Sequence, residues 1–124
     1  MLNLDTHMLV FALNGELRPA ERALLAQNRW SVAAIVLWEL AKLVDLGRID
    51  MDLDDRDVSR VLNRIQIWPL DLAVARASTR LDFESDPADQ LIAATSIVHN
   101  IPLLTRDRII RRSKLVPLAI PGSG

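Results

Sequence analysis

Four acidic residues that lie far apart in the chain carry the clearest chemical signal: Asp5, Glu39, Asp89 and Asp107. Two carboxylates about 4 Å apart repel by about 4 kcal/mol at an effective dielectric constant near 20, so several converge only where a cation neutralises them. Oxygen donors without thiolate or histidine ligands favour Mg²⁺, with Mn²⁺ as the alternative. Bound Mg²⁺ polarises a phosphoryl oxygen and acidifies a bound water, which suits phosphodiester hydrolysis.

Two of these acids, Asp5 and Asp107, come shortly after apolar segments at residues 2–4 and 102–105, which are predicted strands. Open α/β sheets bind ligands beyond the carboxyl ends of their strands, so both acids are predicted at such a site. Each also precedes a predicted helix, and for either residue alone an N-cap role explains the position equally well. Asp71 shows the same strand-to-helix pattern and is interpreted as a cap only.

Glu39 lies inside the apolar arc of a predicted helix. At about 100° per residue it falls between Ile35 and Leu46 on one side and Leu43 on the other. A carboxylate buried there without a partner costs on the order of several kcal/mol, so it needs a cation, hydrogen bonds or a raised pKa. The alternatives are a side chain that extends to solvent or a salt bridge with an arginine.

The segment from Asp86 to Asp89, with the sequence DPAD, predicts the start of a helix. Asp86 suits the N-cap, Pro87 suits the first helical position, and an acid in the first turn favours the helix dipole. Local structure alone therefore explains both acids. Because a cap side chain turns back onto backbone amides, we expect Asp86 to cap and Asp89 to project into the site, with Asp86 as its support.

The composition of the chain predicts one domain, residues 1–120, followed by a disordered tail or expression remnant at residues 121–124. No apolar stretch approaches the ~20 residues of a membrane span, and no positive charge precedes the first apolar segment, so a cytoplasmic protein without membrane contact is expected. The absence of cysteine excludes disulfides and thiolate metal sites. The formal net charge is −1, although residues 106–114 are mostly cationic and favour local contact with a polyanion.

Predicted strands and helices alternate along the chain. The strands are expected at residues 2–4, 30–33, 67–70, 102–105 and 115–118. The helices are expected at residues 6–14, 19–27, 34–46, 54–65, 72–80 and 87–99, with a short one beginning near residue 107. Gly47 is expected to end the third helix in the left-handed conformation, and Pro69 marks an edge strand. This alternation predicts a mostly parallel sheet covered by helices on both faces.

The sequence blocks around the acids, in their order and spacing, resemble the PIN domain, and specifically the VapC toxins of type II toxin–antitoxin pairs. The blocks are LDTH at residues 4–7, LWEL at 37–40, GRI at 47–49, DPAD at 86–89, LIAAT at 91–95 and LLTRD at 103–107. The resemblance covers nearly the whole chain. It implies a three-layer α/β/α sandwich with a mostly parallel central sheet, and a Mg²⁺-dependent endoribonuclease that hydrolyses RNA with a metal-activated water.

The resemblance also assigns roles to individual residues. The metal-binding and catalytic acids would be Asp5, Glu39, Asp89 and Asp107, adjoined by Asp86, with the hydroxyls of Thr6 and Thr105 in support. Arg106, Arg108 and Arg111 would bind RNA phosphates, the alternative being a solvated helix face. The implied partners are a cognate antitoxin, whose amphipathic segment lies in a groove over the site, and a second copy of the toxin in a homodimer.

Three positions depart from the family pattern. Ala33 and Val36 stand where small hydroxyl residues are common before the Trp-Glu pair, and Gln90 stands where an arginine commonly follows the third acid. These changes keep open a catalytically weak PIN-like module that binds RNA or an antitoxin without turnover. A phosphatase of the haloacid dehalogenase type is a weaker alternative, because it needs an Asp-x-Asp motif and this chain has His7 at the third position.

Overall fold

Four short strands form the centre of the fold. The computed structural model describes residues 1–122. The strands are β1 (Leu2–Leu4), β2 (Trp30–Ala33), β3 (Gln66–Trp68) and β4 (Leu103–Leu104). The helices are α1 (Thr6–Asn14), α2 (Pro19–Ala26), α3 (Ala34–Asp45), α4 (Arg56–Leu62), α5 (Leu72–Ser78), α6 (Pro87–His99) and α7 (Arg108–Arg111). The predicted alternation of strands and helices is confirmed.

The strands pair in the order β3-β2-β1-β4, and every pairing is parallel. The chain adds β2 and β3 on one side of β1 and then returns to add β4 on the other side. This reversal makes the carboxyl ends of β1 and β4 a switch point, the position at which parallel sheets bind ligands. Asn3 is in register with both Ser31 of β2 and Leu103 of β4, so β1 is a central strand.

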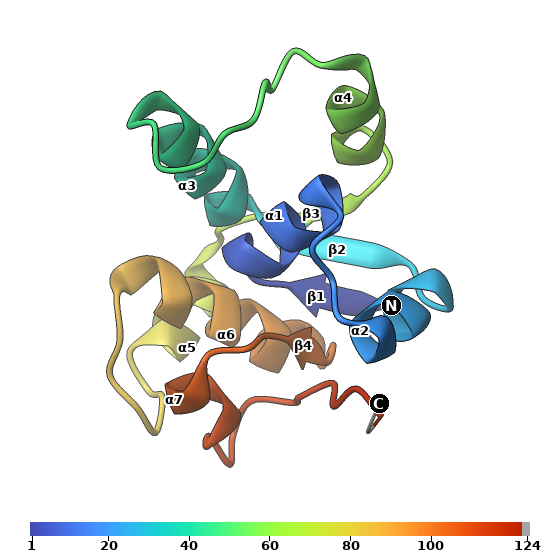
Figure 1. Cartoon of the computed structure of the whole chain (residues 1–124). Coiled ribbons are helices and arrows are strands. Elements are labelled where there is room, and N and C mark those ends of the chain that lie inside the picture. Colours follow the sequence, from blue (N-terminus) through green and yellow to red (C-terminus); the bar gives the residue numbers. More distant parts are fainter. Residues whose placement is uncertain (123–124) are drawn as a thin grey trace.

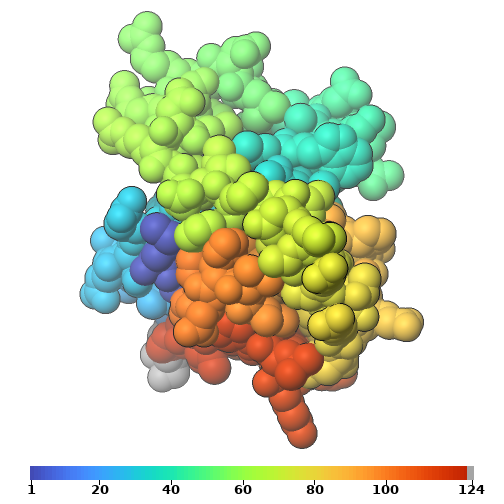
Figure 2. All heavy atoms as spheres, turned by 180° about the vertical axis from the view of Figure 1, so that it is seen from behind, coloured from blue at the N-terminus to red at the C-terminus, as the bar shows by residue number. Residues whose placement is uncertain are grey.

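Helices cover the sheet on both sides, as the predicted α/β/α arrangement requires. Figure 1 shows α3 and α4 on one side of the strands and α5, α6 and α7 on the other. Between α3 and α4 the chain forms a long connection that arches away from the sheet, drawn in green (Figure 1). From behind, the yellow helix α5 lies beside the orange helix α6 (Figure 2), with which it packs closely.

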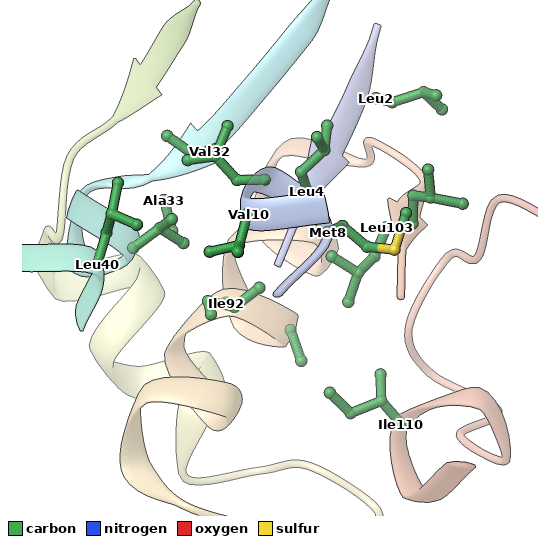
Figure 3. Close-up of a cluster of buried hydrophobic side chains, with 14 of the residues drawn as sticks. Leu2, Leu4, Met8, Val10, Val32, Ala33, Leu40, Ile92, Leu103 and Ile110 are labelled. Carbon is green, nitrogen blue, oxygen red and sulfur yellow. The ribbon is translucent and has the colours of Figure 1, made fainter. Parts of the chain in front are cut away.

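The core lies between the sheet and its helices. Leu4, Val32 and Leu103 of three adjacent strands, Met8 of α1 and Ile92 of α6 are all inaccessible to solvent, and they surround one apolar space (Figure 3). Burial of such side chains contributes roughly 1.5–3 kcal/mol each. This packing holds the amino-terminal part of α6, and therefore its first-turn acid, close to the ends of β1 and β4.

Two buried hydrogen bonds tie β1 directly to α6. The Asn3 side-chain amide, fully buried, donates to the Ser96 hydroxyl over 2.9 Å and to the Ile92 carbonyl over 3.4 Å. These bonds satisfy the Asn3 Nδ2, whereas the buried Oδ1 has no hydrogen-bond partner among the described residues. The contact sets the relative position of two elements that carry site residues.

Several predicted boundaries were wrong. The segment 115–118 is no strand but makes a single bridge from Leu118 to Leu103, because Pro117 has no N–H with which to continue a ladder. The third strand runs over residues 66–68 rather than 67–70, because Pro69 ends it. Helix α4 is shorter than predicted at both ends, and helix α5 is shorter than predicted at its carboxyl end.

Other local expectations are confirmed. Gly47, with φ +70°, adopts the left-handed conformation just after α3. In the part of the chain that is described, even α6, with 13 residues, is too short to span a membrane, and no other helix has the required length and hydropathy. Of the predicted tail, Pro121 and Gly122 have no regular secondary structure, and residues 123–124 lie outside the described residues.

Candidate active site

An acidic cleft of about 410 Å³ opens at the carboxyl edge of the sheet. Its walls contain all four predicted acids and the supporting Asp86. The lining residues are Asp5, His7, Met8, Phe11, Glu39, Asp86, Asp89, Arg106 and Asp107. The acids come from the end of β1, the middle of α3, the first turn of α6 and the turn after β4. The tertiary structure therefore brings together carboxylates from four separate segments.

Asp5 is both a helix cap and a cleft residue. Its Oδ1 accepts a hydrogen bond of 2.9 Å from the Met8 backbone N–H, and its Oδ2 accepts one from the Thr105 hydroxyl. The side chain is almost completely buried, and this burial raises the pKa of Asp5. The charge of Asp89 raises that pKa further, whereas the two hydrogen bonds and His7 lower it. A cation in the cleft would stabilise the ionised form.

Asp107 repeats this double arrangement after β4. Its Oδ1 accepts hydrogen bonds from the N–H groups of Ile109 (2.8 Å) and Ile110 (3.1 Å) and so caps α7. Within residues 1–122 its Oδ2 has no hydrogen-bond donor. The Thr105 hydroxyl, which donates to Asp5, accepts the Asp107 backbone N–H over 3.0 Å. One hydroxyl thereby fixes both strand-end acids relative to each other.

Glu39 is half-buried on α3, as the apolar helix pattern predicts. Its Oε1 accepts a hydrogen bond from the hydroxyl of Thr6, which is itself buried. Among the described residues no arginine or lysine forms a salt bridge with Glu39. The Glu39 carboxylate is therefore only partly solvated, and no cationic side chain of residues 1–122 neutralises it. The residues at the departing positions, Ala33 and Val36, are buried and supply no hydroxyl.

Asp89 is half-buried in the first turn of α6, and its Oδ2 accepts a hydrogen bond of 2.9 Å from the Ser85 hydroxyl. Burial raises the pKa of Asp89, and the charges of Glu39, Asp107 and Asp86 raise it further, although Ser85 lowers it. The cause is geometric, because these carboxylates line one cleft. Sequence reasoning missed Ser85, which stands one residue before the helix signal and carried no spacing cue of its own.

Asp86 corrects a sequence prediction. It occupies the N-cap position of α6, but its side chain makes no capping hydrogen bond. Pro87 at the first helical position leaves the N–H groups of the next two residues available, so nothing in the local sequence explains why this cap is not made. The exposed side chain of Asp86 instead lies at the wall of the acidic cleft. It therefore adds negative charge to the cleft.

The carboxylate oxygens of the cleft are the type of ligand that a hard divalent cation prefers. All five acids offer oxygen, and their mutual repulsion falls when a cation is bound. Across residues 1–122 no three acidic or histidine side chains stand close enough to ligate one ion directly. Mg²⁺ usually keeps several waters and takes only one or two carboxylates directly, so this spacing suits an ion that also contacts the acids through water.

The three arginines predicted to bind RNA have different surroundings. Arg106 lines the cleft, but its guanidinium pairs with Glu21 of α2, with Nε–Oε2 and Nη2–Oε1 distances of 2.8 and 2.6 Å. Arg108 and Arg111 are exposed on α7, and Arg111 lines a separate cavity of about 190 Å³ beside Arg106. The predicted phosphate contacts stay predictions. Sequence reasoning missed Glu21, because no local pattern links α2 to the turn after β4.

A second, larger groove of about 620 Å³ adjoins the cleft. The two share His7, Phe11, Glu39 and Asp86, so they form one continuous depression. The rest of the groove combines apolar and charged side chains: Val10, Asn14, Glu16, Leu43, Arg48, Ile49 and Asp50. The sequence interpretation gave His7 no site role, although its position two residues after Asp5, in the first turn of α1, was the available signal.

Comparison with known proteins agrees with this architecture. The PIN domain family model matches residues 3–114. Ribonuclease VapC22 of Mycobacterium tuberculosis is 33% identical over 95 residues, which cover 74% of this chain and 73% of that protein. VapBC2 of Rickettsia felis, solved bound to a DNA fragment from its promoter, superposes with a TM-score of 0.72 at 22% identity, covering 96% of this chain and 98% of that one. DNA-bound VapBC of Salmonella typhimurium gives 0.68 at 18% identity, covering 95% and 96%. The chain belongs to the PIN-domain family, and within it to the VapC group.

Proposed function

We propose that this protein is a Mg²⁺-dependent endoribonuclease and the toxin of a VapBC-type toxin–antitoxin pair. The observation that carries the proposal is the convergence of Asp5, Glu39, Asp89 and Asp107 in one cleft. There, no cationic side chain within residues 1–122 forms a salt bridge with Glu39, and burial raises the pKa of Asp5 and Asp89. Membership of the VapC group and the similarity to a protein named as a ribonuclease support the substrate class.

In the proposed mechanism, Asp5 and Asp107 would hold the ion, because the Thr105 hydroxyl bonds to the Asp5 side chain and to the Asp107 backbone N–H at the switch point. Glu39, oriented by Thr6, and Asp89, oriented by Ser85, would complete the site as further carboxylate acceptors. When bound, Mg²⁺, or Mn²⁺ in its place, supplies positive charge for the phosphate and acidifies a water. The products would carry a 5′-phosphate and a 3′-hydroxyl.

The decisive experiment incubates the purified protein with end-labelled RNA in Mg²⁺, and separately in EDTA. Cleavage in Mg²⁺ that stops in EDTA and returns on Mg²⁺ addition is the expected result. Equal cleavage in EDTA would refute the metal dependence. Complete absence of cleavage together with RNA binding would favour the second candidate, a PIN-like module that binds without turnover. The observation that favours that alternative is the buried pair Ala33 and Val36, which supply no hydroxyl beside the acids.

We further propose that an antitoxin segment occupies the continuous depression formed by the groove and the cleft. Apolar side chains of an amphipathic segment would contact Val10, Phe11, Leu43 and Ile49, and a cationic side chain would reach the acids. Solved structures of similar fold include a toxin–antitoxin complex from Klebsiella pneumoniae. Copurification with the product of a neighbouring gene tests this partner, and the L43D variant, at a half-buried groove position, should lose it.

The remaining parts of the proposal concern assembly and location. Family resemblance implies a homodimer, which light scattering on the isolated chain tests. A mass near twice that of the 13.9 kDa chain is expected. Because the proposed substrate is cellular RNA, the proposed site of action is the cytoplasm. The nuclease domain is proposed to span residues 1–120.

A further inference from the structure

Arg106 is the one arginine that lines the acidic cleft among the residues described, yet its guanidinium bonds elsewhere. Besides its two contacts with Glu21, Nη2 donates to the Glu16 carbonyl over 3.2 Å. The guanidinium carbon also lies 4.0 Å from the centre of the Phe11 ring, in position for a cation–π contact. Four contacts therefore hold this group on the wall of the cleft.

Glu21 is itself held firmly. It is only 3% exposed, and its Oε1 accepts a hydrogen bond of 2.8 Å from the Arg18 backbone N–H in the capping box of α2. The same carboxylate receives both hydrogen bonds from Arg106, in the bidentate geometry that is the strongest form of this pair. Glu21 thus joins α2 to the turn that carries Asp107.

An arginine released at this position would have other carboxylates within reach. Arg106 directly precedes Asp107, and both line the same cleft as Asp5 and Asp89. A guanidinium matches a carboxylate bidentately and stays charged at any physiological pH, so it would compete with a metal ion for the same oxygens. Only a stronger, preorganised partner prevents this competition.

We propose that Glu21 is a positioning residue, which retains Arg106 on the cleft wall and thereby keeps the acids free to bind a divalent cation. The inference rests on the proposed metal site but concerns residues outside the acid set. Glu21 does not line the acidic cleft and is proposed to contact neither substrate nor metal. Its contribution is to remove an internal competitor, while the retained positive charge stays beside the cleft.

Mn²⁺ titration by isothermal calorimetry tests the proposal without an activity assay. Three proteins are compared: wild type, E21Q and the double variant E21Q/R106M. Both variants lack the ion pair, but only E21Q keeps a guanidinium, which then has no carboxylate partner on the cleft wall. We expect E21Q to bind Mn²⁺ about tenfold more weakly, since a hydrogen bond to a charged group is worth about this factor. The double variant should return to within about twofold of wild type.

Each alternative outcome has a definite meaning. Mn²⁺ binding by E21Q equal to that of wild type overturns the proposal, and so does a double variant that binds no better than E21Q. Absence of Mn²⁺ binding by the wild-type protein would instead refute the proposed metal site. Thermal unfolding followed by circular dichroism verifies that all three proteins fold. If E21Q does not fold, R106K replaces it, because one ammonium cannot make both contacts with Glu21; unchanged Mn²⁺ affinity in R106K then overturns the proposal.

Discussion

Two almost completely buried carboxylates in the same part of the molecule meet opposite electrostatic conditions. Glu21, 3% exposed, pairs with Arg106, and this pairing lowers its pKa. Asp5, 8% exposed, accepts hydrogen bonds from two neutral donors and, within residues 1–122, from no cationic side chain, and burial raises its pKa. A buried acid with an internal cation stabilises the fold, whereas one without an internal cation can bind an external cation. Burial alone does not distinguish these two roles.

A comparison of helix caps leads to the same conclusion. Asp71 follows β3 and caps α5 through a hydrogen bond of 3.0 Å from the Val74 N–H, just as Asp5 follows β1 and caps α1. The two residues are locally alike. They differ because β3 is the edge strand of the sheet, far from the switch point, whereas β1 lies beside β4. Neighbouring strands, rather than the cap itself, make Asp5 a site residue.

The largest expected effect is on RNA cleavage, which should depend on the cap residue Asp5 but not on the cap residue Asp71. The D5N variant should lose RNA cleavage by roughly a hundredfold or more, because removing a residue that supports a metal site costs at least that order. Asn remains a good cap, so the free energy of unfolding should hardly fall. The matched control is D71N, which should cleave at the wild-type rate. Single-turnover cleavage and urea unfolding provide the two readouts, and a fully active D5N protein would refute the assignment.

The second prediction concerns metal and stability. Mg²⁺ at about 100 times its Kd should raise the free energy of unfolding of the wild-type protein by about 2.7 kcal/mol, because the ion binds only the folded state. The D5N/D107N variant should lose this gain, and D71N should keep it. Thermal melts in Mg²⁺ and in EDTA measure the difference. If Mg²⁺ does not change the stability of the wild-type protein, the cleft acids do not bind the ion and have a structural role, as Glu21 does.

A smaller effect is expected from the arginines that Glu21 does not hold. Replacing Arg108 and Arg111 by Gln, in the D5N background, should flatten the dependence of RNA affinity on salt by about 1.4 in logarithmic slope, if each contacts one phosphate of a single strand. The control removes two exposed charges from α4, as R56Q/R60Q, and should leave the slope unchanged. Filter binding at several salt concentrations measures it. Equal slopes in all proteins would show that Arg108 and Arg111 do not contact RNA phosphates and form only a solvated helix face.

The smallest effect is the pH dependence of the Glu21 pair. The folded-state pKa of Glu21 lies below its unfolded value of about 4.3, so the pair stabilises the protein above that pH. The stabilisation is lost as pH falls through the lowered folded-state pKa. The difference in unfolding free energy between wild type and E21Q, measured in EDTA, should therefore be largest near neutrality and shrink below about pH 4. A difference that grows on acidification would contradict the sign of this pKa shift.

Much of the fold could be predicted from local patterns. The apolar segments at β1 and β2, the helix α3 with Gly47 after it, and the proline that opens α6 all appear where expected. The predicted strand at 115–118 was wrong. The hydrophobicity of the segment favours a strand, but Pro117 limits its pairing to a single bridge. The cap prediction for Asp86 was wrong although the local pattern is that of a cap, because the Asp86 side chain lies at the wall of the acidic cleft instead.

The sequence by itself determined where helices begin, which residues are buried and which acids stand at strand ends, because these follow from apolar spacing and from cap chemistry within a few residues. Only the tertiary structure decided which acids meet. The parallel order β3-β2-β1-β4 places Asp5 beside Thr105 and Asp107, and the packing of α2 against the turn after β4 gives Arg106 its partner. Both results depend on contacts between distant segments, whose geometry no local pattern encodes.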